Sequence, residues 1–273
     1  MISIFAKHTY TLDTENNDGV YLQRVSSRVR GEEIAEYLGA KFNPVSGYED
    51  DVCIRVKSCG LKHIRDGDYV DALDDNWLVG WLKDRPKVKV IAMSQAHYEL
   101  LKKELTNDIV LIPHHHVNFE RVVRDREKIN TCGYVGVNSP RDRSINHKIR
   151  RELKKIDMYF VPLFNFITRQ DIIDYYKTID IQVIGYFDYL DTPFRHPAKV
   201  INAMSFGIPT VAYPIMGYKD IEDYYIKVNN MEEMINEVEK LKDKDYYNQW
   251  SNKIIKEAEK YHISEIAKKY KQL

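Results

Sequence analysis

The feature that most constrains the fold of this chain is the alternation of short apolar runs with segments of helical periodicity. In the first half, apolar runs typical of buried strands occur at residues 2–5, 52–56, 69–73 and 88–93. Between such runs lie segments with apolar residues on one helical face, such as the one that reaches Leu38 and stops at Gly39. Because strands and helices that alternate along a chain form βα units, this pattern predicts an α/β protein with mostly parallel sheets.

The same alternation resumes after an interruption near the middle of the chain. Residues 118–128 are polar and charge-rich and have almost no apolar periodicity, which is typical of a linker. Further strand-like runs follow at residues 132–137, 158–161, 181–185 and 209–213. We therefore predict two lobes, residues 1–120 and residues 128–250, followed by a helical tail at residues 251–273.

The composition of the chain indicates which binding partners and which cellular compartment to expect. The chain contains 41 Lys+Arg and 41 Asp+Glu, so no global charge draws it to nucleic acid or anionic lipid. The spacing of its three cysteines matches no zinc pattern, and their odd number favours a reduced, cytoplasmic setting. The N-terminus lacks a basic region before an apolar stretch, and no run of about 18 apolar residues occurs, so we expect a soluble protein without a transmembrane segment.

A series of motifs carries a resemblance to a known class of enzymes. Residues 70–77 read Val-Asp-Ala-Leu-Asp-Asp-Asn-Trp, and residues 112–116 read Ile-Pro-His-His-His. Residues 133–136 read Gly-Tyr-Val-Gly, and residues 197–211 run from Pro-Ala-Lys to Gly-Ile-Pro-Thr-Val. In this order and at this separation the motifs resemble GT-B glycosyltransferases of the group 1 type, over nearly the whole chain.

The resemblance implies a fold and an activity. It implies two Rossmann-like lobes with a cleft between them, an N-terminal acceptor lobe, a C-terminal nucleotide-sugar lobe, and a closing helix that packs back toward the first lobe. The implied activity is hexosyltransferase-like transfer from a nucleotide-diphosphate sugar, UDP-sugar foremost, to an unidentified acceptor: a glycan, a small molecule or DNA. The sugar nucleotide would be a substrate, and no cofactor is implied.

The chain departs from the class at one helix. Many members place two glutamates eight positions apart there, and the corresponding positions hold Phe194 and Asn202. This departure leaves open whether sugar is transferred with retention. It also leaves open a catalytically inactive GT-B-like protein that serves binding or regulation.

A donor site must stabilise the diphosphate as negative charge grows on it during transfer. Basic residues rather than paired aspartates mark the region implied to bind the donor, so we predict binding without metal. Lys199 falls in the first turn of a helix, where a cation gains nothing from the helix dipole and is easier to understand beside a bound anion. The predicted donor-binding residues are Gly136, Asn138, Arg141, Arg143, Arg195 and Lys199.

The segment 141–155 carries seven Lys/Arg against two acidic residues. An apolar stripe of Ile145, Ile149 and Leu153 predicts a helix that packs on a sheet with its charges in solvent. Phosphate binding by the first basic residues is compatible with that packing. A nucleic-acid surface is the third alternative, and it would suit a DNA-directed glycosyltransferase.

Candidates for acid–base chemistry lie in the first half of the chain. If the reaction inverts, a carboxylate or histidine must take the acceptor's proton, and the candidates are His8, Asp13 and Asp74, with Asp75 as the alternative to Asp74. His8 is equally well explained as a surface-loop residue, and Asp74 as part of a helix cap before Trp77.

The run of three histidines at residues 114–116 is a candidate metal site. Strand alternation sends the outer two histidines to one side and His115 to the other, so the three do not converge on one ion and we predict no metal site. We expect His115 to face the cleft.

Overall fold

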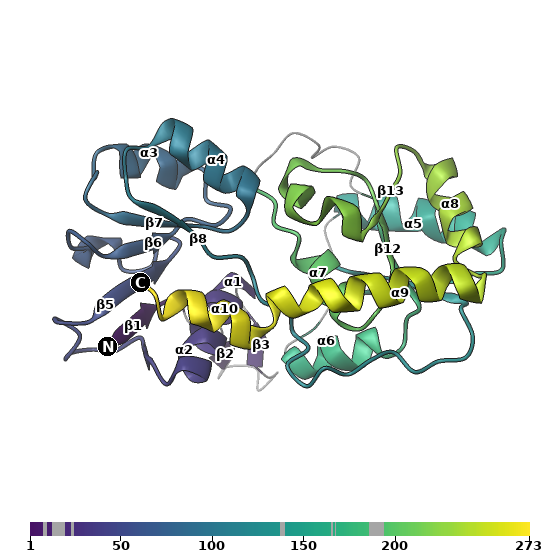
Figure 1. Cartoon of the computed structure of the whole chain (residues 1–273), viewed down its shortest axis with the longest axis horizontal. Coiled ribbons are helices and arrows are strands. Elements are labelled where there is room, and N and C mark those ends of the chain that lie inside the picture. The colour runs from purple at the N-terminus through teal and green to yellow at the C-terminus, as the bar shows by residue number, and fades with distance from the viewer. Residues whose placement is uncertain are drawn as a thin grey trace. The chain divides into compact units, whose positions relative to one another are not determined.

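A computed structural model describes residues 1–7, 10–12, 20–22, 25–136, 140–164, 166, 168–185 and 194–273. These residues form two compact units, each with its own parallel sheet (Figure 1). Unit 1 comprises Met1–His115, Pro193–His196 and Ile263–Leu273, and unit 2 comprises His116–Thr192 and Pro197–His262. The prediction of an α/β chain with two parallel sheets is confirmed.

The sheet of unit 1 has the strand order β4-β1-β5-β6-β7-β8, and all neighbouring strands are parallel. Its strands are β1 (Ile2–Phe5), β4 (Lys41–Phe42), β5 (Val52–Val56), β6 (Tyr69–Asp71), β7 (Lys89–Ala92) and β8 (Ile109–Leu111). A separate antiparallel pair is formed by β2 (Tyr10–Leu12) and β3 (Val20–Leu22). Because the main strands are parallel, their carboxyl ends lie along one edge, where open α/β sheets bind ligands.

Unit 1 contains both longer α-helices and short helical turns. They are α1 (Val25–Ser27), the π-helical turn η1 (Arg28–Glu32), α2 (Glu33–Leu38), the short 3₁₀ helix η2 (Leu61–His63), α3 (Trp77–Lys83), α4 (Gln95–Glu104) and α10 (Ile263–Tyr270). The Ser94 hydroxyl caps α4 by accepting a hydrogen bond from the His97 N–H at 3.2 Å. Gly39 ends α2 with a φ of 63°, a conformation that glycine adopts without strain.

Helix α10 is the last element of the chain, and it belongs to unit 1. It packs against α2, and its buried face consists of Ile263, Ile266, Ala267 and Tyr270. These residues have the three- and four-residue spacing of an amphipathic helix. The short 3₁₀ helix η4 (Glu259–Tyr261) separates α10 from the long helix before it.

The sheet of unit 2 has the strand order β10-β9-β11-β12-β13, again with all neighbours parallel. Its strands are β9 (Thr131–Val135), β10 (Tyr159–Leu163), β11 (Ile181–Ile184), β12 (Thr210–Ala212) and β13 (Ile226–Lys227). Its helices are α5 (Pro140–Lys154), α6 (Arg169–Tyr176), α7 (Ala198–Ser205), η3 (Met216–Tyr224), α8 (Met231–Lys240) and α9 (Lys244–Ala258). Gly133 lets α6 approach β9 closely, because a Cβ there would overlap the side chains of Tyr175 and Ile179.

The patternless segment before β9 is fixed by buried polar groups of unit 2. The Asn118 amide donates to the carbonyls of Val122 and Ser205, both at 2.8 Å. Asp180 is fully buried and accepts from the Arg124 guanidinium at 2.7 Å and from the Thr131 N–H at 2.8 Å. Long-range hydrogen bonds therefore supply the order that apolar periodicity does not predict here. The predicted lobe boundaries stay a prediction.

Candidate functional site

The carboxyl end of β9 in unit 2 brings together three residues of the resembling motifs. Tyr134 lies near the end of β9, and the Lys199 ammonium lies 5.2 Å from the centre of its ring. A Cβ at Gly136 would overlap the same ring, so a larger residue there would have to displace it. Tyr134 is thus bounded by Gly136 and the first turn of α7.

The start of α7 is fixed by buried partners on β11 and α6. The Gln182 amide donates to the Lys199 carbonyl at 2.9 Å, and the Tyr176 hydroxyl donates to the same oxygen at 3.3 Å. Both partner side chains are fully buried. The main chain of Lys199 is therefore held in place while its side chain extends over Tyr134 at partial exposure.

The other predicted donor-binding residues divide between the two units. Arg143 lies exposed near the start of α5 in unit 2, and Arg195 lies exposed in a segment that belongs to unit 1. Asn138 and the side chain of Arg141 lie outside the described residues. The structure therefore brings Gly136 and Lys199 together through Tyr134, a residue that sequence reasoning did not select.

A second polar cluster lies at the carboxyl end of β6 in unit 1. Arg30 and Asp71 are both fully buried, and the Arg30 Nε donates to the Asp71 carboxylate at 2.6 Å. Arg30 also donates to the carbonyls of Ile112 and Pro113, at 2.8 and 2.7 Å. Burial raises the pKa of Asp71, and the Arg30 guanidinium opposes that rise. This ion pair ties η1 to the ends of β6 and β8.

A partly exposed ion pair, between Lys57 and Asp74, lies beside the pair of Arg30 and Asp71. The Lys57 ammonium is 2.6 Å from the Asp74 carboxylate, just after the ends of β5 and β6. Burial acts to raise the pKa of Asp74, but the hydrogen bond and charge of Lys57 outweigh it, so the pKa is lowered. Lys57 and Leu73 have φ values of 55° and 46°, which are strained for residues with a Cβ. Such strain tends to gather at functional sites.

Three histidines of unit 1 surround the same edge. His97 on α4 is fully buried and lies 5.4 Å, ring to ring, from Phe194. His114, just after β8, is also buried, and its ring lies 4.1 Å from that of His196. Phe194 and His196 come from the short segment that unit 1 receives from the second half of the chain.

The environment keeps the two buried imidazoles uncharged. Burial, helped by the Arg30 charge, lowers the pKa of His97 to about 4. Burial, with His196 and Arg30 as further causes, holds the pKa of His114 well below its ordinary value. At neutral pH both rings can therefore accept and donate hydrogen bonds without carrying charge.

The predicted catalytic residues are only partly within the described residues. His8 and Asp13 lie outside them, whereas Asp74 lies at the strained edge with Lys57. The imidazole of His115, predicted to face a cleft, is buried in unit 1, where Nε2 lies 2.8 Å from the Val29 carbonyl and 3.5 Å from Glu33. The roles assigned to these residues stay predictions.

The two positions where many class members hold glutamates have other partners here. The Phe194 ring lies 5.4 Å from that of His97 in a tilted arrangement, and the Asn202 side chain accepts a hydrogen bond from the Val117 N–H at 3.0 Å. Neither side chain can act as a carboxylate.

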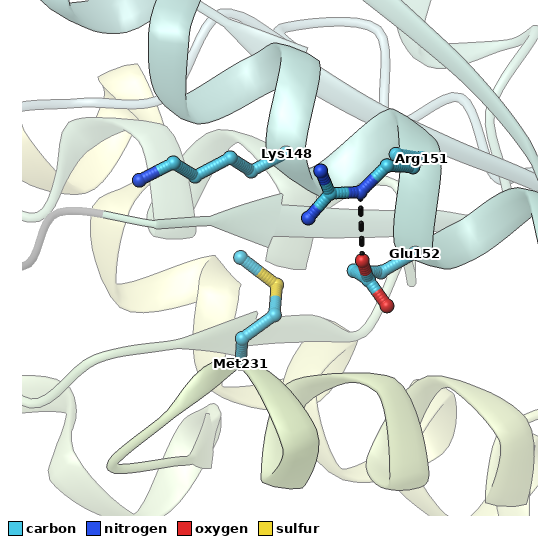
Figure 2. Close-up of a pocket in the computed structure, with 4 residues that line it drawn as sticks. All are labelled: Lys148, Arg151, Glu152 and Met231. Carbon is cyan, nitrogen blue, oxygen red and sulfur yellow. Dashed lines mark hydrogen bonds and ion pairs between the residues drawn. The ribbon is translucent and has the colours of Figure 1, made fainter.

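A pocket of about 400 Å³ opens on another face of unit 2, between α5 and α8. It is lined by Lys148, Arg151, Glu152 and Met231, and the Arg151 Nε donates to Glu152 at 3.0 Å (Figure 2). On the opposite face of α5, Ile149 and Leu153 are fully buried. The helix therefore packs through its apolar stripe and presents its basic residues outward.

Acidic pairs with Asp-x-Asp spacing occur at two places, Asp66/Asp68 and Asp243/Asp245, and one member of each has a structural role. Asp68 is buried and binds Arg65 at 3.0 Å, whereas Asp66 pairs with Lys87 at 3.1 Å. Asp243, of the second pair, caps α9. Within the described part of the chain, no group of three or more His, Cys, Asp or Glu is arranged to hold a metal, and no helix could span a membrane.

Sequence reasoning missed the residues whose importance comes from distant contacts. Arg30 and His97 sit on helices without any motif, and the signal that could have marked them is a charged or polar residue on an otherwise apolar helix face. His196 lies between Arg195 and the Pro-Ala-Lys motif at residue 197, and this position beside two motif residues is the signal that marks it.

Comparisons with solved structures point to one fold. A mutant of TarM from S. aureus, in complex with fondaparinux, α-GlcNAc-glycerol and UDP, matches 84% of this chain at a TM-score of 0.57 and 14% identity. The pneumococcal O-GlcNAc transferase GtfA, with UDP and GlcNAc, matches 82% at 0.56 and 11% identity. Anabaena HepE, with UDP and glucose, matches 81% at 0.54 and 11% identity.

These likenesses concern architecture. This chain covers 52% of the TarM and GtfA structures, about half their length, and 71% of HepE. No protein-family model and no curated protein matches the sequence. The two parallel sheets and the structural likenesses together show that the chain has the GT-B fold of glycosyltransferases.

Proposed function

We propose that the chain transfers a sugar from a nucleotide-diphosphate sugar, UDP-sugar foremost, to an acceptor hydroxyl, with the donor bound by unit 2. The observation that carries the proposal is the arrangement of Gly136, Tyr134 and Lys199 at the carboxyl end of β9. This is the edge of a parallel sheet at which ligands of open α/β folds bind.

The chemistry of the donor fits this edge. As the bond to the sugar breaks, negative charge grows on the leaving diphosphate and must be stabilised. We assign this stabilisation to the Lys199 ammonium, together with backbone N–H groups of the N-terminal turn of α7. Lys199 would thus supply the stabilisation that other transferases take from a metal, and the proposed reaction runs without one.

The choice of UDP rests on the structural likenesses. TarM, GtfA and HepE were each solved in complex with UDP, and two of them also with GlcNAc or glucose. We therefore take hexoses carried by UDP as the first donors to test.

Unit 1 is proposed to bind the acceptor. The edge at β6 and β8 carries the Lys57–Asp74 ion pair, the strained backbone of Lys57 and Leu73, and uncharged imidazoles, and we propose Asp74 as the described candidate for receiving the acceptor's proton. His8 and Asp13 remain candidates for the same role.

Donor binding and turnover can be measured separately. Titration calorimetry with UDP-glucose and UDP-GlcNAc, with GDP-, ADP- and TDP-sugars as comparisons, should show binding of a UDP-sugar, and release of UDP should show turnover. Binding of none of these nucleotides would overturn the proposal.

Metal independence has its own test. With EDTA present, the dissociation constant for the best donor should stay unchanged. If EDTA abolishes donor binding and magnesium restores it, the assignment of Lys199 as the stabilising charge is wrong.

A further inference from the structure

The pocket between α5 and α8 lies on the opposite face of the unit 2 sheet from α7. Successive residues of a strand point to opposite faces, and on β11 Ile181 and Val183 pack with α5 and α8, whereas Ile184 packs with α7. Gln182 also points to the α7 face, because its amide donates to the Lys199 carbonyl. The pocket is therefore separated by the sheet from the helix that carries Lys199.

Two helices supply the walls of the pocket. Lys148, Arg151 and Glu152 lie on α5, and Figure 2 shows the Met231 side chain extending from the start of α8 toward the first two of them. Both helices are anchored on the sheet by fully buried residues of their inner faces. The volume of about 400 Å³ lies in the range that small organic ligands occupy. The pocket is thus large enough for a small molecule and has walls held from behind.

The charges around the pocket do not balance. The Glu152 carboxylate pairs with the Arg151 Nε at 3.0 Å and also with the Lys155 ammonium. The Lys148 ammonium makes no ion pair or hydrogen bond with any residue that the structure describes, and neither do the Arg151 Nη atoms. Three cations therefore surround one carboxylate, which leaves a net charge of +2.

This charge and the thioether select the chemistry of a ligand. A carboxylate ligand brings only one negative charge, whereas a phosphate ester carries about −1.5 to −2 at pH 7. The Arg151 Nη atoms donate in a plane that matches phosphate oxygens, and Lys148 adds a point charge on a flexible stem. The Met231 sulfur packs favourably against an aromatic ring. An organic phosphate with an apolar body satisfies all three side chains.

We propose that Lys148, Arg151 and Met231 form a binding site for a small soluble phosphomonoester with an apolar body. None of Gly136, Tyr134 and Lys199 lines this pocket, so the site is additional to the proposed donor site. The proposal does not depend on the proposed glycosyl transfer.

The unaltered full chain provides the first test. With ¹³C-methyl-labelled methionine, the Met231 signal is identified by its loss in Met231→Leu and followed during titrations with phenyl phosphate, phenol and inorganic phosphate. We expect phenyl phosphate to shift the signal at lower concentrations than inorganic phosphate, and phenol to leave it unchanged. No shift with phenyl phosphate, an equal shift with phenol, or equal affinity for inorganic phosphate would each overturn the proposal.

A membrane is the other source of a phosphate ester. Vesicles of phosphatidylcholine with phosphatidic acid are therefore added in a separate titration, and we expect them to leave the Met231 signal unchanged. If the vesicles shift the signal and phenyl phosphate does not, the ligand is a lipid headgroup and the proposed soluble ligand is wrong.

Variants provide a second, independent test. Lys148→Gln removes one cation of the pocket, and Lys154→Gln is the matched control, because Lys154 is an exposed lysine of the same helix that does not line the pocket. We expect Lys148→Gln to weaken the binding of phenyl phosphate at least about tenfold, as the loss of one charge-assisted contact does. The control should bind normally. Unchanged affinity in Lys148→Gln, or an equal loss in both variants, would show that the pocket does not select the ligand.

Lys199→Met distinguishes this pocket from the donor site. The substitution should leave the shift of the Met231 signal by phenyl phosphate unchanged, because α7 lies on the opposite face of the sheet. If Lys199→Met abolishes the shift, phenyl phosphate binds at the donor site and the proposal is wrong.

Discussion

Replacing Lys199 with methionine removes the ammonium and keeps an unbranched apolar side chain over the Tyr134 ring. If this ammonium contacts the donor diphosphate, its loss removes a charge-assisted contact of about 1.5–3 kcal/mol, which weakens donor binding about 10- to 150-fold. The fold should lose far less, because the contact between Lys199 and Tyr134 is a partly exposed cation–π pair worth about 0.5–1 kcal/mol. The backbone anchors of Lys199 are unaffected by the substitution.

The assay is titration calorimetry of the variant with the best nucleotide sugar, beside urea unfolding of the same preparation. Lys240→Met is the matched control, because Lys240 is an exposed lysine of unit 2 whose partner is Glu237. Donor affinity in Lys199→Met within twofold of the unaltered chain would refute the assignment. An affinity loss of equal size in Lys240→Met would refute it too, since the effect would then be one of general charge.

Three further predictions test the fold and the site. Asp180→Ala leaves the buried Arg124 guanidinium without its carboxylate and should lower the free energy of unfolding by about 3–5 kcal/mol in urea titrations, whereas a loss below about 1 kcal/mol would contradict the role of Asp180. Gly136→Ala should displace the Tyr134 ring and cost about 1–3 kcal/mol of stability, with weaker UDP binding in calorimetry; unchanged binding and stability would show that the ring has room to move. The unfolded chain protonates His97 near pH 6.5 and the folded chain only near pH 4, so the unfolded state binds more protons as the pH falls through this window, and stability should drop by about 2 kcal/mol between pH 7 and pH 5 on account of this group. In His97→Gln the drop should be smaller by that amount, and an identical pH dependence in both proteins would rule out a buried neutral imidazole.

Local signals in the sequence predict much of the fold. The Ser94 cap and the Gly39 stop depend on neighbours within a few residues, so the sequence places these helix ends correctly. The apolar runs of the central strands β6, β9, β11 and β12 are similarly self-contained, because each of these strands is buried on both faces.

The candidate site could be predicted only in part. Gly136 and Lys199 lie in motifs, but the ring that joins them belongs to Tyr134, whose role depends on α7 arriving more than sixty residues later along the chain. The buried pair of Arg30 and Asp71 likewise joins residues 41 positions apart. Apolar periodicity predicts which face of a helix or strand is buried. It does not predict which charged residues, far apart in the sequence, form a pair in the folded chain.

Unit 1 contains residues from both ends of the chain, and this arrangement affects how it can fold during synthesis. Residues 263–273 leave the ribosome after all of unit 2, yet α10 covers α2 and places the Tyr270 ring 5.6 Å from the Arg30 guanidinium. Unit 2 spans residues 116–262 except for Pro193–His196, which belong to unit 1. It can therefore complete its core while synthesis of the chain continues. The apolar face of α2 therefore stays uncovered until α10 has been synthesised.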